Sequence, residues 1–241
     1  MSLKLTTIQI LASLSLLCSA CGTEHNIQSN QIPATGSRVK FIHAVVDGPA
    51  VNVFANDTKL NGTALTYGTA FPTEYSVIAP GQTTLRVTTV ASGTVAQATV
   101  LTAPVALEAD KYYSVVAAGT ALAPVGFLVN DDQTVPDPKK NYIRVLNLVS
   151  TGQAVDLAIG TGSPLLTNVP YKGVSEYVAI EPNAASAPYS FQIRNTGATT
   201  LLGTALSFNT LNQGRKYTLV VRGAVGRTGT AAPTLFTYTV K

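Results

Sequence analysis

The sequence repeats itself with a period of about 104 residues, and this repeat limits the chain to two copies of one domain. Residues 39–53, VKFIHAVVDGPAVNV, align without gaps with residues 143–157, IRVLNLVSTGQAVDL. Two later blocks match in the same order, 75–81 with 177–183 and 111–119 with 215–223. The repeat predicts domains over residues 38–133 and 141–241. The linker over residues 134–140 contains two prolines and should be short and rather stiff.

Each copy is divided into short runs rich in β-branched and aromatic residues, with Gly, Pro, Asn or Asp between them. No segment has a convincing 3.6-residue apolar period, so helices are not expected. The first copy holds seven such runs, near residues 38–46, 50–55, 73–78, 84–90, 94–101, 112–118 and 125–129. Seven short strands in about 95 residues are typical of a sandwich. We therefore predict an all-β chain with two tandem immunoglobulin-like antiparallel β-sandwich domains.

The first run predicts a strand with one buried face. Val39, Phe41 and Val45 alternate with Arg38, Lys40 and Ala44. Side chains of a strand point to opposite faces in turn, so we expect the face of Val39 to meet the core. The face of Lys40 should then meet solvent.

A leucine stands six residues before a tyrosine in both copies, as Leu107 and Tyr113 in the first and Leu211 and Tyr217 in the second. Each tyrosine opens an apolar strand. The pattern resembles the tyrosine corner of immunoglobulin-like sandwiches, in which the phenol bonds nearby backbone. A tyrosine that is simply part of the core is the alternative.

The first twenty residues have the layout of a secretory signal. Lys4 precedes an apolar run over residues 8–17, and the small residues Ser19 and Ala20 stand before Cys21. This ending resembles the lipobox of bacterial lipoproteins, in which diacylglycerol is joined to the cysteine thiol. The resemblance implies a signal peptide over residues 1–20, a lipidated Cys21, and a flexible tether over residues 21–37. We expect the chain to be lipid-anchored in the bacterial cell envelope, at the outer membrane.

Cys18 stands where a lipobox most often has leucine, and with Cys21 it forms a C-x-x-C. Such a spacing can also indicate a redox or metal site. However, Cys18 lies in the segment that we expect to be removed, and no βαβ pattern follows it. We predict no disulfide, no cofactor and no metal. No second apolar run of about 18 residues occurs, so lipid is the only membrane attachment that we predict.

Charge is divided unevenly between the copies. Residues 22–138 carry five Lys/Arg and nine Asp/Glu, whereas residues 139–241 carry ten and three, which gives about −4 and +7. The basic half could bind an acidic glycan, lipopolysaccharide, an acidic protein or the acidic half of a neighbouring copy. Surface charges that serve only solubility are the alternative. Nucleic acid is not an expected partner, because the basic residues form no stripe interleaved with aromatics. The oligomeric state stays open.

The first copy carries a recognisable signature. The stretch from His43 through Asp47 and Pro49 to Val53, HAVVDGPAVNV, with the later APG and KYYSVV segments, resembles the family of domains of unknown function numbered 4397. The resemblance implies an exported bacterial protein, tandem copies and an immunoglobulin-type sandwich, but no activity. The second copy departs from the signature, with Asn147, Thr151 and Gln153 in place of the histidine, aspartate and proline.

Few residues suit catalysis. His25 lies in the tether, so His43 is the one candidate imidazole base in a folded domain. No G-x-S-x-G motif is present, and the acids are few and mostly near turns. We predict that the chain is not an enzyme and has no catalytic residue. The competing enzyme hypothesis is a hydrolase with a cleft between the copies that holds His43 and acids from both.

The candidate polar site comprises His43, Asp47 and Asn52. Asn147 and Asp156 stand at two of the equivalent positions in the second copy. One interpretation is that such residues bridge the first strand and the next, and tie the turn between them. The other is a ligand or metal site at His43 and Asp47, although one imidazole and one acid are too few ligands on their own.

Three acids near the linker, Asp131, Asp132 and Asp137, offer oxygen ligands of the kind that calcium takes. They could bind calcium between the domains. Solvated loop acids are the alternative interpretation.

Two functions remain. The first is a non-catalytic envelope module, either structural or presenting loops to a protein or glycan. The alternative is a carbohydrate-binding accessory of a surface glycan-uptake system, which needs an exposed aromatic face. Tryptophan is absent and most tyrosines fall at matched positions, which favours packed aromatics.

Overall fold

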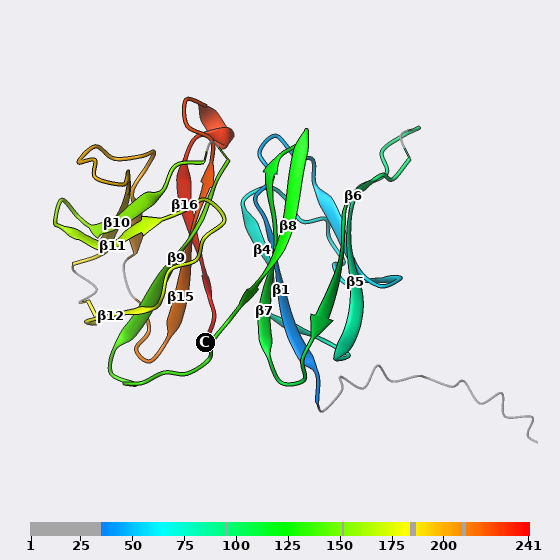
Figure 1. Cartoon of the computed structure of the whole chain (residues 1–241), viewed down its shortest axis with the longest axis horizontal. Helices are drawn as coiled ribbons and strands as arrows, with labels where there is room; N and C mark the ends of the chain where they lie inside the picture. Colours follow the sequence, from blue (N-terminus) through cyan, green and yellow to red (C-terminus); the bar gives the residue numbers. More distant parts are fainter. Residues whose placement is uncertain (1–34, 95, 151, 184–186, 209–210) are drawn as a thin grey trace, which may run out of the picture. The chain divides into compact units, whose positions relative to one another are not determined.

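A computed structural model describes residues 35–94, 96–150, 152–183, 187–208 and 211–241 (Figure 1). The expected signal peptide, Cys21 and nearly all of the tether lie outside these residues. In the described part of the chain, no helix is long and apolar enough to cross a membrane.

The first copy forms two four-stranded sheets (Figure 1). Their strand orders are β4-β1-β7-β8 and β3-β2-β5-β6. The strands are β1 (Ser37–His43), β2 (Val51–Ala55), β3 (Thr58–Lys59), β4 (Thr69–Ile78), β5 (Gly81–Thr89), β6 (Thr99–Leu107), β7 (Tyr112–Thr120) and β8 (Ala123–Asn130).

The second copy repeats this arrangement. Its sheets have the orders β12-β9-β15-β16 and β11-β10-β13-β14. The strands are β9 (Asn141–Val149), β10 (Val155–Ile159), β11 (Pro164–Val169), β12 (Val178–Ile180), β13 (Tyr189–Asn195), β14 (Leu206–Phe208), β15 (Lys216–Gly223) and β16 (Thr234–Thr239), with a 3-10 turn η1 (Gly229–Ala231) before the last.

The two sets of sheets correspond strand for strand, which confirms an all-β chain of two tandem β-sandwiches. The pairs β1–β7 and β9–β15 are parallel, and every other named strand pair among the described residues is antiparallel. Parallel neighbours need a long crossover connection. In each copy the chain makes this crossover by building the opposite sheet between the two strands.

One predicted strand is misplaced. β6 occupies Thr99–Leu107 rather than residues 94–101, and it contains Pro104. A proline cannot donate to a neighbouring strand, which argues against a strand at this place in the sequence. β6 tolerates Pro104 because it lies at the edge of its sheet and pairs only with β5.

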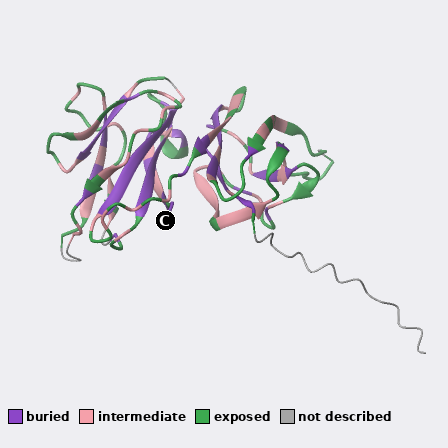
Figure 2. Ribbon diagram, turned by 60° about the horizontal axis from the view of Figure 1, so that its bottom comes forward, coloured by how far each residue is buried: buried purple, intermediate pink, exposed green. Residues whose placement is uncertain are grey.

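The prediction that β1 exposes one face is also wrong. Val39 and Phe41 pack in the core of the first sandwich as expected. On the opposite face, Lys40 and Ile42 are each only 1% exposed, because the second sandwich covers that face. β9 is buried over its whole length in the same way, and such strands are purple in Figure 2. In each copy these strands lie in the middle of the sheet that faces the other sandwich.

The structure confirms the tyrosine corners. The Tyr113 hydroxyl accepts a hydrogen bond from the Glu108 N–H at 3.2 Å, and the Tyr217 hydroxyl accepts one from the Asn212 N–H at 3.0 Å. Each bond joins the start of a central strand to the loop five residues before it, and so fixes the chain as it enters β7 or β15.

Candidate functional site

The two sandwiches meet through the outer faces of the sheets that contain β1 and β9. One apolar cluster there takes side chains from both copies: Ile42, Ala44, Val116, Ala118, Val129, Leu146, Leu148, Val220, Tyr238 and Val240. Removal of apolar surface from water is the main driving force for such association. The cluster therefore holds the two sandwiches together as one packed interface.

A buried acid lies beside this cluster. The carboxylate of Asp131, just after β8, accepts hydrogen bonds from the Tyr75 hydroxyl at 2.7 Å and the Ser114 hydroxyl at 2.6 Å. It also pairs with the guanidinium of Arg144 from the second sandwich. Both charged side chains are almost fully buried, at 0% and 5% exposure. The Ser114 hydroxyl also bonds the Tyr238 hydroxyl at 2.8 Å, which extends the network into the second sandwich.

Lys40 crosses the interface in the other direction. Its ammonium donates to the Thr73 carbonyl at 2.7 Å and to the Thr239 carbonyl of the second sandwich at 3.0 Å. It also lies over the rings of Tyr75 and Tyr238, 4.7 and 5.4 Å from their centroids. Burial lowers the pKa of Lys40, while Glu74 and Asp131 act to raise it. A buried lysine is thus satisfied by backbone oxygens and ring faces.

Lys216 forms the third buried cationic contact. Its ammonium donates to Asp132 at 2.6 Å and to the Thr134 carbonyl at 3.0 Å, and lies 3.8 Å from the centre of the Tyr177 ring. Burial alone would raise the pKa of Asp132, but the hydrogen bond from Lys216 holds it at about 2. The linker is therefore tied to the second sandwich where it begins.

The three acids near the linker do not converge on a common point. Asp131 bonds Arg144, Asp132 bonds Lys216, and Asp137 accepts from the Lys139 N–H at 2.9 Å. Over the described ranges, no three or more His, Cys, Asp or Glu side chains gather as metal ligands would. Arg144 and Lys216 lie beside Asp131 and Asp132, where the calcium hypothesis needs a metal ion.

His43 ties the loop that follows β1. Its Nδ1 accepts a hydrogen bond from the Val45 N–H at 3.4 Å, and its Nε2–H donates to the Pro49 carbonyl at 2.9 Å. In the second copy, Asn147 accepts from the Val149 N–H at 3.1 Å and donates to the Gln153 carbonyl at 2.8 Å. The two different side chains thus make the same pair of bonds, to residues two and six positions later.

The other two candidate residues lie elsewhere. Asp47 is half exposed and forms an ion pair at 2.6 Å with Arg227 of the second sandwich. Asn52 is buried in β2 opposite Thr88. Its counterpart Asp156 accepts bonds from the backbone of residues 168 and 197. Among the hydrogen bonds and ion pairs of the described residues, none joins any two of His43, Asp47 and Asn52.

Replacing His43 with asparagine is expected to lower the free energy of unfolding by no more than about 1 kcal/mol, because Asn147 makes the same bonds in the second copy. Leucine would leave the Val45 N–H and the Pro49 carbonyl without partners, at about 1–3 kcal/mol each. Urea unfolding followed by circular dichroism measures both variants. Equal losses for asparagine and leucine would contradict the proposed tie.

The native chain and the His43→Asn variant should also differ in how their stability depends on pH. Burial lowers the pKa of His43, although the bond to Pro49 opposes this. The unfolded chain then binds the proton more tightly, so the stability that His43 contributes is complete above about pH 6.5 and is lost as the pH falls through the lowered pKa. His43→Asn should therefore lose less stability between about pH 7 and pH 5 than the native chain.

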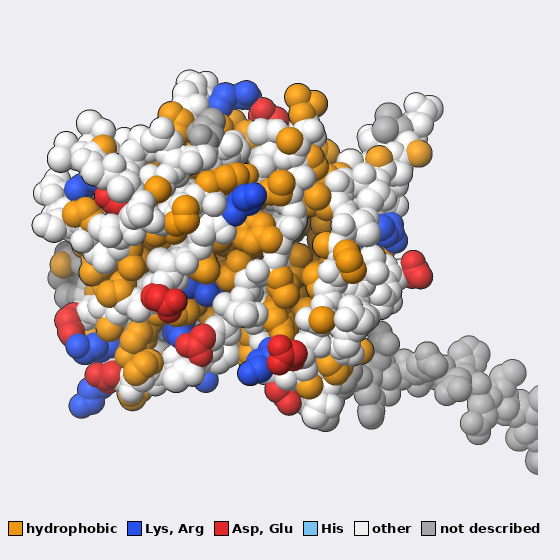
Figure 3. Space-filling model, viewed as in Figure 1, with side chains coloured by type: hydrophobic (Ala, Val, Ile, Leu, Met, Phe, Trp, Pro, Cys, Tyr) orange, Lys and Arg blue, Asp and Glu red, His pale blue; other side chains and the backbone are white. Residues whose placement is uncertain are grey.

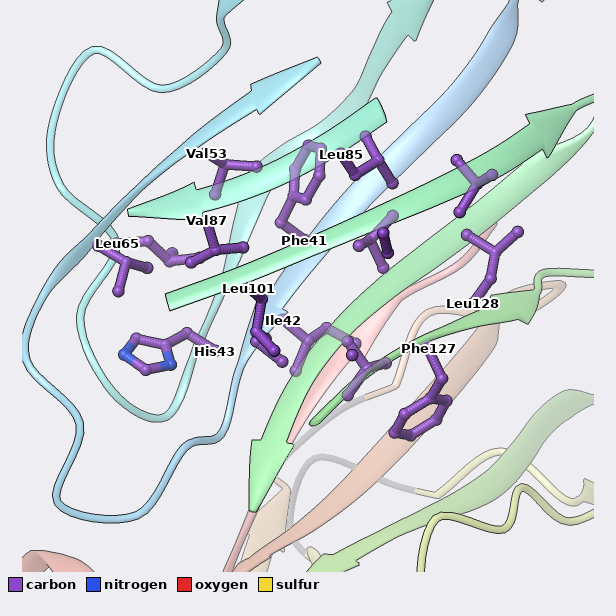
Figure 4. Close-up of a pocket in the computed structure, with 17 residues that line it drawn as sticks. Phe41, Ile42, His43, Val53, Leu65, Leu85, Val87, Leu101, Phe127 and Leu128 are labelled. Carbon is purple, nitrogen blue, oxygen red and sulfur yellow. The ribbon is translucent and has the colours of Figure 1, made fainter. Parts of the chain in front are cut away.

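The core of the first sandwich contains an apolar cavity of about 40 Å³ (Figure 4). Phe41, Leu85 and Leu101 line it, with His43 near one end. Leu85 lies opposite Ala103 in the first copy, whereas the corresponding pair in the second copy is Phe191 and Leu206. The smaller pair leaves space for no more than about three water molecules. This cavity is therefore a packing gap and not a pocket for a sugar or a lipid chain.

Two larger clefts lie beside the interface, with volumes of about 540 and 340 Å³. The first is lined by Lys40, Glu74, Arg215 and Phe236 among others, and the second by Asn130, Arg144, Glu176 and Tyr177 among others. Each takes residues from both sandwiches. His43 lines neither, so these clefts lack the imidazole that the hydrolase hypothesis requires.

No aromatic side chain in the described residues is exposed over most of its surface. All ten tyrosines and seven phenylalanines lie in the described residues, and each is buried or half-buried. The exposed large apolar residues there are aliphatic: Val90, Leu122, Val174, Leu201 and Val225. A flat aromatic platform for sugars is therefore not formed. On the face in Figure 3, charged side chains occur in small separate groups.

Comparisons with known proteins identify one family. A family model described as "Domain of unknown function (DUF4397)" matches residues 37–158 and again 141–240. Among solved structures, the chain is similar to the crystal structure of a "putative cell adhesion protein" from Bacteroides fragilis, at 9% identity and a TM-score of 0.20, covering 85% of this chain and 97% of that one. No curated protein sequence matches the chain.

Proposed function

This chain belongs to the DUF4397 family, of which it holds two copies, and we propose that it is a non-catalytic, lipid-anchored module of the bacterial cell envelope. Its two sandwiches act as one unit that presents loops to a partner. The interface between them is the observation that carries the proposal.

Buried charged side chains hold this interface together. Lys40, Arg144 and Lys216 bond acids or backbone carbonyls, and Asp131 is surrounded by donors. His43, the one imidazole in the described residues, ties a loop. Groups that catalysis would need as acids, bases or nucleophiles are thus committed to fixing the two sandwiches and their loops.

Loops from both sandwiches gather at one end. β1 and β7 run parallel, so the loop after β1 and the turn between β7 and β8 lie at the same end of the first sandwich. Leu122 in that turn is 98% exposed. The ion pair between Asp47 and Arg227 brings the loop between β15 and β16 beside them. We propose these loops as the surface for a protein or acidic glycan.

The carbohydrate-binding alternative has less support, because the buried and half-buried aromatics provide no stacking face. A glycan would have to be bound through charge, by the basic second sandwich.

Replacing Cys21 with serine is expected to abolish lipidation, because no thiol remains for the diacylglycerol. The protein should move from the membrane to the soluble fraction, since several acyl chains at about 0.8 kcal/mol per buried CH₂ provide the anchor. Incorporation of labelled palmitate and cell fractionation measure both effects. Cys18→Ser is the matched control, and it should stay lipidated because the signal peptide is removed. Membrane-bound, palmitate-labelled Cys21→Ser protein would exclude the anchor.

Protease treatment of intact cells then locates the domains. Release of peptides from residues 195–215, with a periplasmic control intact, would favour a surface partner. Protection until lysis would favour a partner inside the envelope.

A further inference from the structure

The interface between the sandwiches is built from equivalent residues of the two copies. Ile42 and Leu146 occupy the same position of the repeat, as do Ala44 and Leu148, and Val116 and Val220. All six lie in the one apolar cluster. Each copy therefore contributes the same face to the contact.

The polar contacts follow the same symmetry. Lys40 and Arg144 are equivalent residues, and each donates to a backbone carbonyl of the opposite sandwich, that of Thr239 for Lys40 and that of Asn130 for Arg144. These acceptors are equivalent too, because Thr239 pairs with Tyr217 and Asn130 with Tyr113 across the last two strands of each copy. The two clefts beside the interface correspond in the same way.

A contact in which each side uses the same patch is a two-fold, self-complementary interface, of the type that joins homodimers. Here the two sides belong to one chain. The same faces exist on every other copy of the protein, so a first sandwich can in principle meet the second sandwich of a neighbour with all of its contacts intact.

Charge selects which sandwiches pair. The three ion pairs that cross the interface, Asp47–Arg227, Asp131–Arg144 and Asp132–Lys216, all place the acid before residue 134 and the base in the second sandwich. Pairing of two second sandwiches would leave Arg144, Lys216 and Arg227 without their acids. Pairing of two first sandwiches would leave Asp47 and Asp132 without their bases. A first sandwich therefore fits a second sandwich best, within one chain or between two.

We propose that this interface is also a docking surface for a second copy of the chain, which forms a dimer by exchanging sandwiches about the linker. Asp131 and Asp132 keep their contacts on exchange, so eight residues, 133–140, remain to connect the sandwiches, and they span up to about 26 Å when extended. That length lets a second sandwich leave its own partner and reach a neighbour. The proposal concerns which chain supplies the second sandwich at the interface, and it does not depend on the lipid anchor.

Within one chain, a short linker keeps the second sandwich near the first at an effective concentration in the millimolar range. Micromolar protein should therefore be monomeric, and exchange should appear when chains refold together at about 1 mM.

Single cysteines on the exposed pair of Asp47 and Arg227 test this directly. The chain from residue 22 onward contains no cysteine, so Asp47→Cys in one copy and Arg227→Cys in another supply the only thiols. The two chains are unfolded together, refolded at about 1 mM and diluted. They are then treated with a short bismaleimide crosslinker. This reagent can span the gap that the arginine side chain leaves, which is too long for a disulfide. Exchange predicts a covalent dimer at several times the yield of the control mixture, Asp57→Cys with Arg227→Cys. Equal yields in the two mixtures would overturn the proposal.

The double variant Asp47→Cys/Arg227→Cys in one chain checks that the reagent spans the interface, and at micromolar concentration it should crosslink within the monomer. Light scattering on the chain without cysteines gives a second, independent measurement. We expect dimers after refolding at about 1 mM and monomers at about 10 µM. Monomers alone at both concentrations would also overturn the proposal.

Discussion

Replacing Asp131 with alanine is expected to lower the free energy of unfolding by about 3–5 kcal/mol. The Arg144 guanidinium would then lie buried without its acid, and the hydroxyls of Tyr75 and Ser114 would lose their acceptor. Breaking a buried ion pair costs far more than the pair contributes, because the remaining charge stays out of water. Urea unfolding measures the loss.

Asp110→Ala is the matched control for Asp131→Ala. Asp110 also pairs with an arginine, Arg38, but at 3.4 Å on the surface, with 63% of its side chain exposed. Asp110 also has a φ of +60°, which alanine adopts less readily than aspartate, so we expect a loss of about 1–2 kcal/mol. Asp131→Ala combined with Arg144→Met removes both charges and should regain much of the stability. A single Asp131→Ala loss no larger than that of Asp110→Ala would contradict the central role of the network.

Replacing Gly119 with alanine is expected to destabilise the chain by about 2–4 kcal/mol. Gly119 has a φ of +88°, and an added Cβ would lie 2.4 Å from the Ala123 carbonyl oxygen across the β7–β8 turn. Gly223, its counterpart in the second copy, has a φ of +113° and the same 2.4 Å approach to the Ala232 carbonyl oxygen. Both variants should therefore lose similar stability, as measured by thermal unfolding.

Gly126→Ala, on the neighbouring strand β8, is the control. An added Cβ there would contact Leu101 at 3.6 Å, an ordinary distance, and would lie at the apolar cavity. We expect a gain of about 0.5–1 kcal/mol, because alanine loses less conformational entropy than glycine. Losses at Gly119 and Gly126 of the same size would show that the strand, and not the left-handed turn, resists substitution.

Local patterns predicted the parts of the fold that local rules determine. The 104-residue repeat predicted two copies of one sandwich, and the spacing of Leu107 from Tyr113 predicted a corner bond. His43 and Asn147 were expected to tie the turn together with Asn52 and Asp156, nine residues later, whereas their hydrogen bonds run to backbone atoms of the turn itself. The corner bond and the bonds within the turn depend on residues close together in sequence, and the repeat is visible in the sequence itself.

The contacts between the copies were not predicted, because they depend on tertiary packing. Lys40 alternates with apolar residues as a solvent-facing lysine would, yet it lies at the interface. A signal was present in β9, where Leu146 and Leu148 make the strand apolar on both faces. Nothing in the local sequence joins Asp131 to Arg144, because both occur in ordinary strand and loop contexts.

The parallel pairing of β1 with β7 has a mechanical consequence. β1 lies between β4 and β7, and residues 38–43 pair in register with residues 112–117. A pull on the chain ahead of Ser37, directed along the strand, would load these backbone hydrogen bonds together in shear instead of opening them one after another like a zipper. Survival under such tension is governed by the rate of forced unfolding, not by the equilibrium free energy. Under the proposed function, an anchor ahead of Ser37 and a partner at the loops would pull along this strand, and its parallel pairing would resist that force.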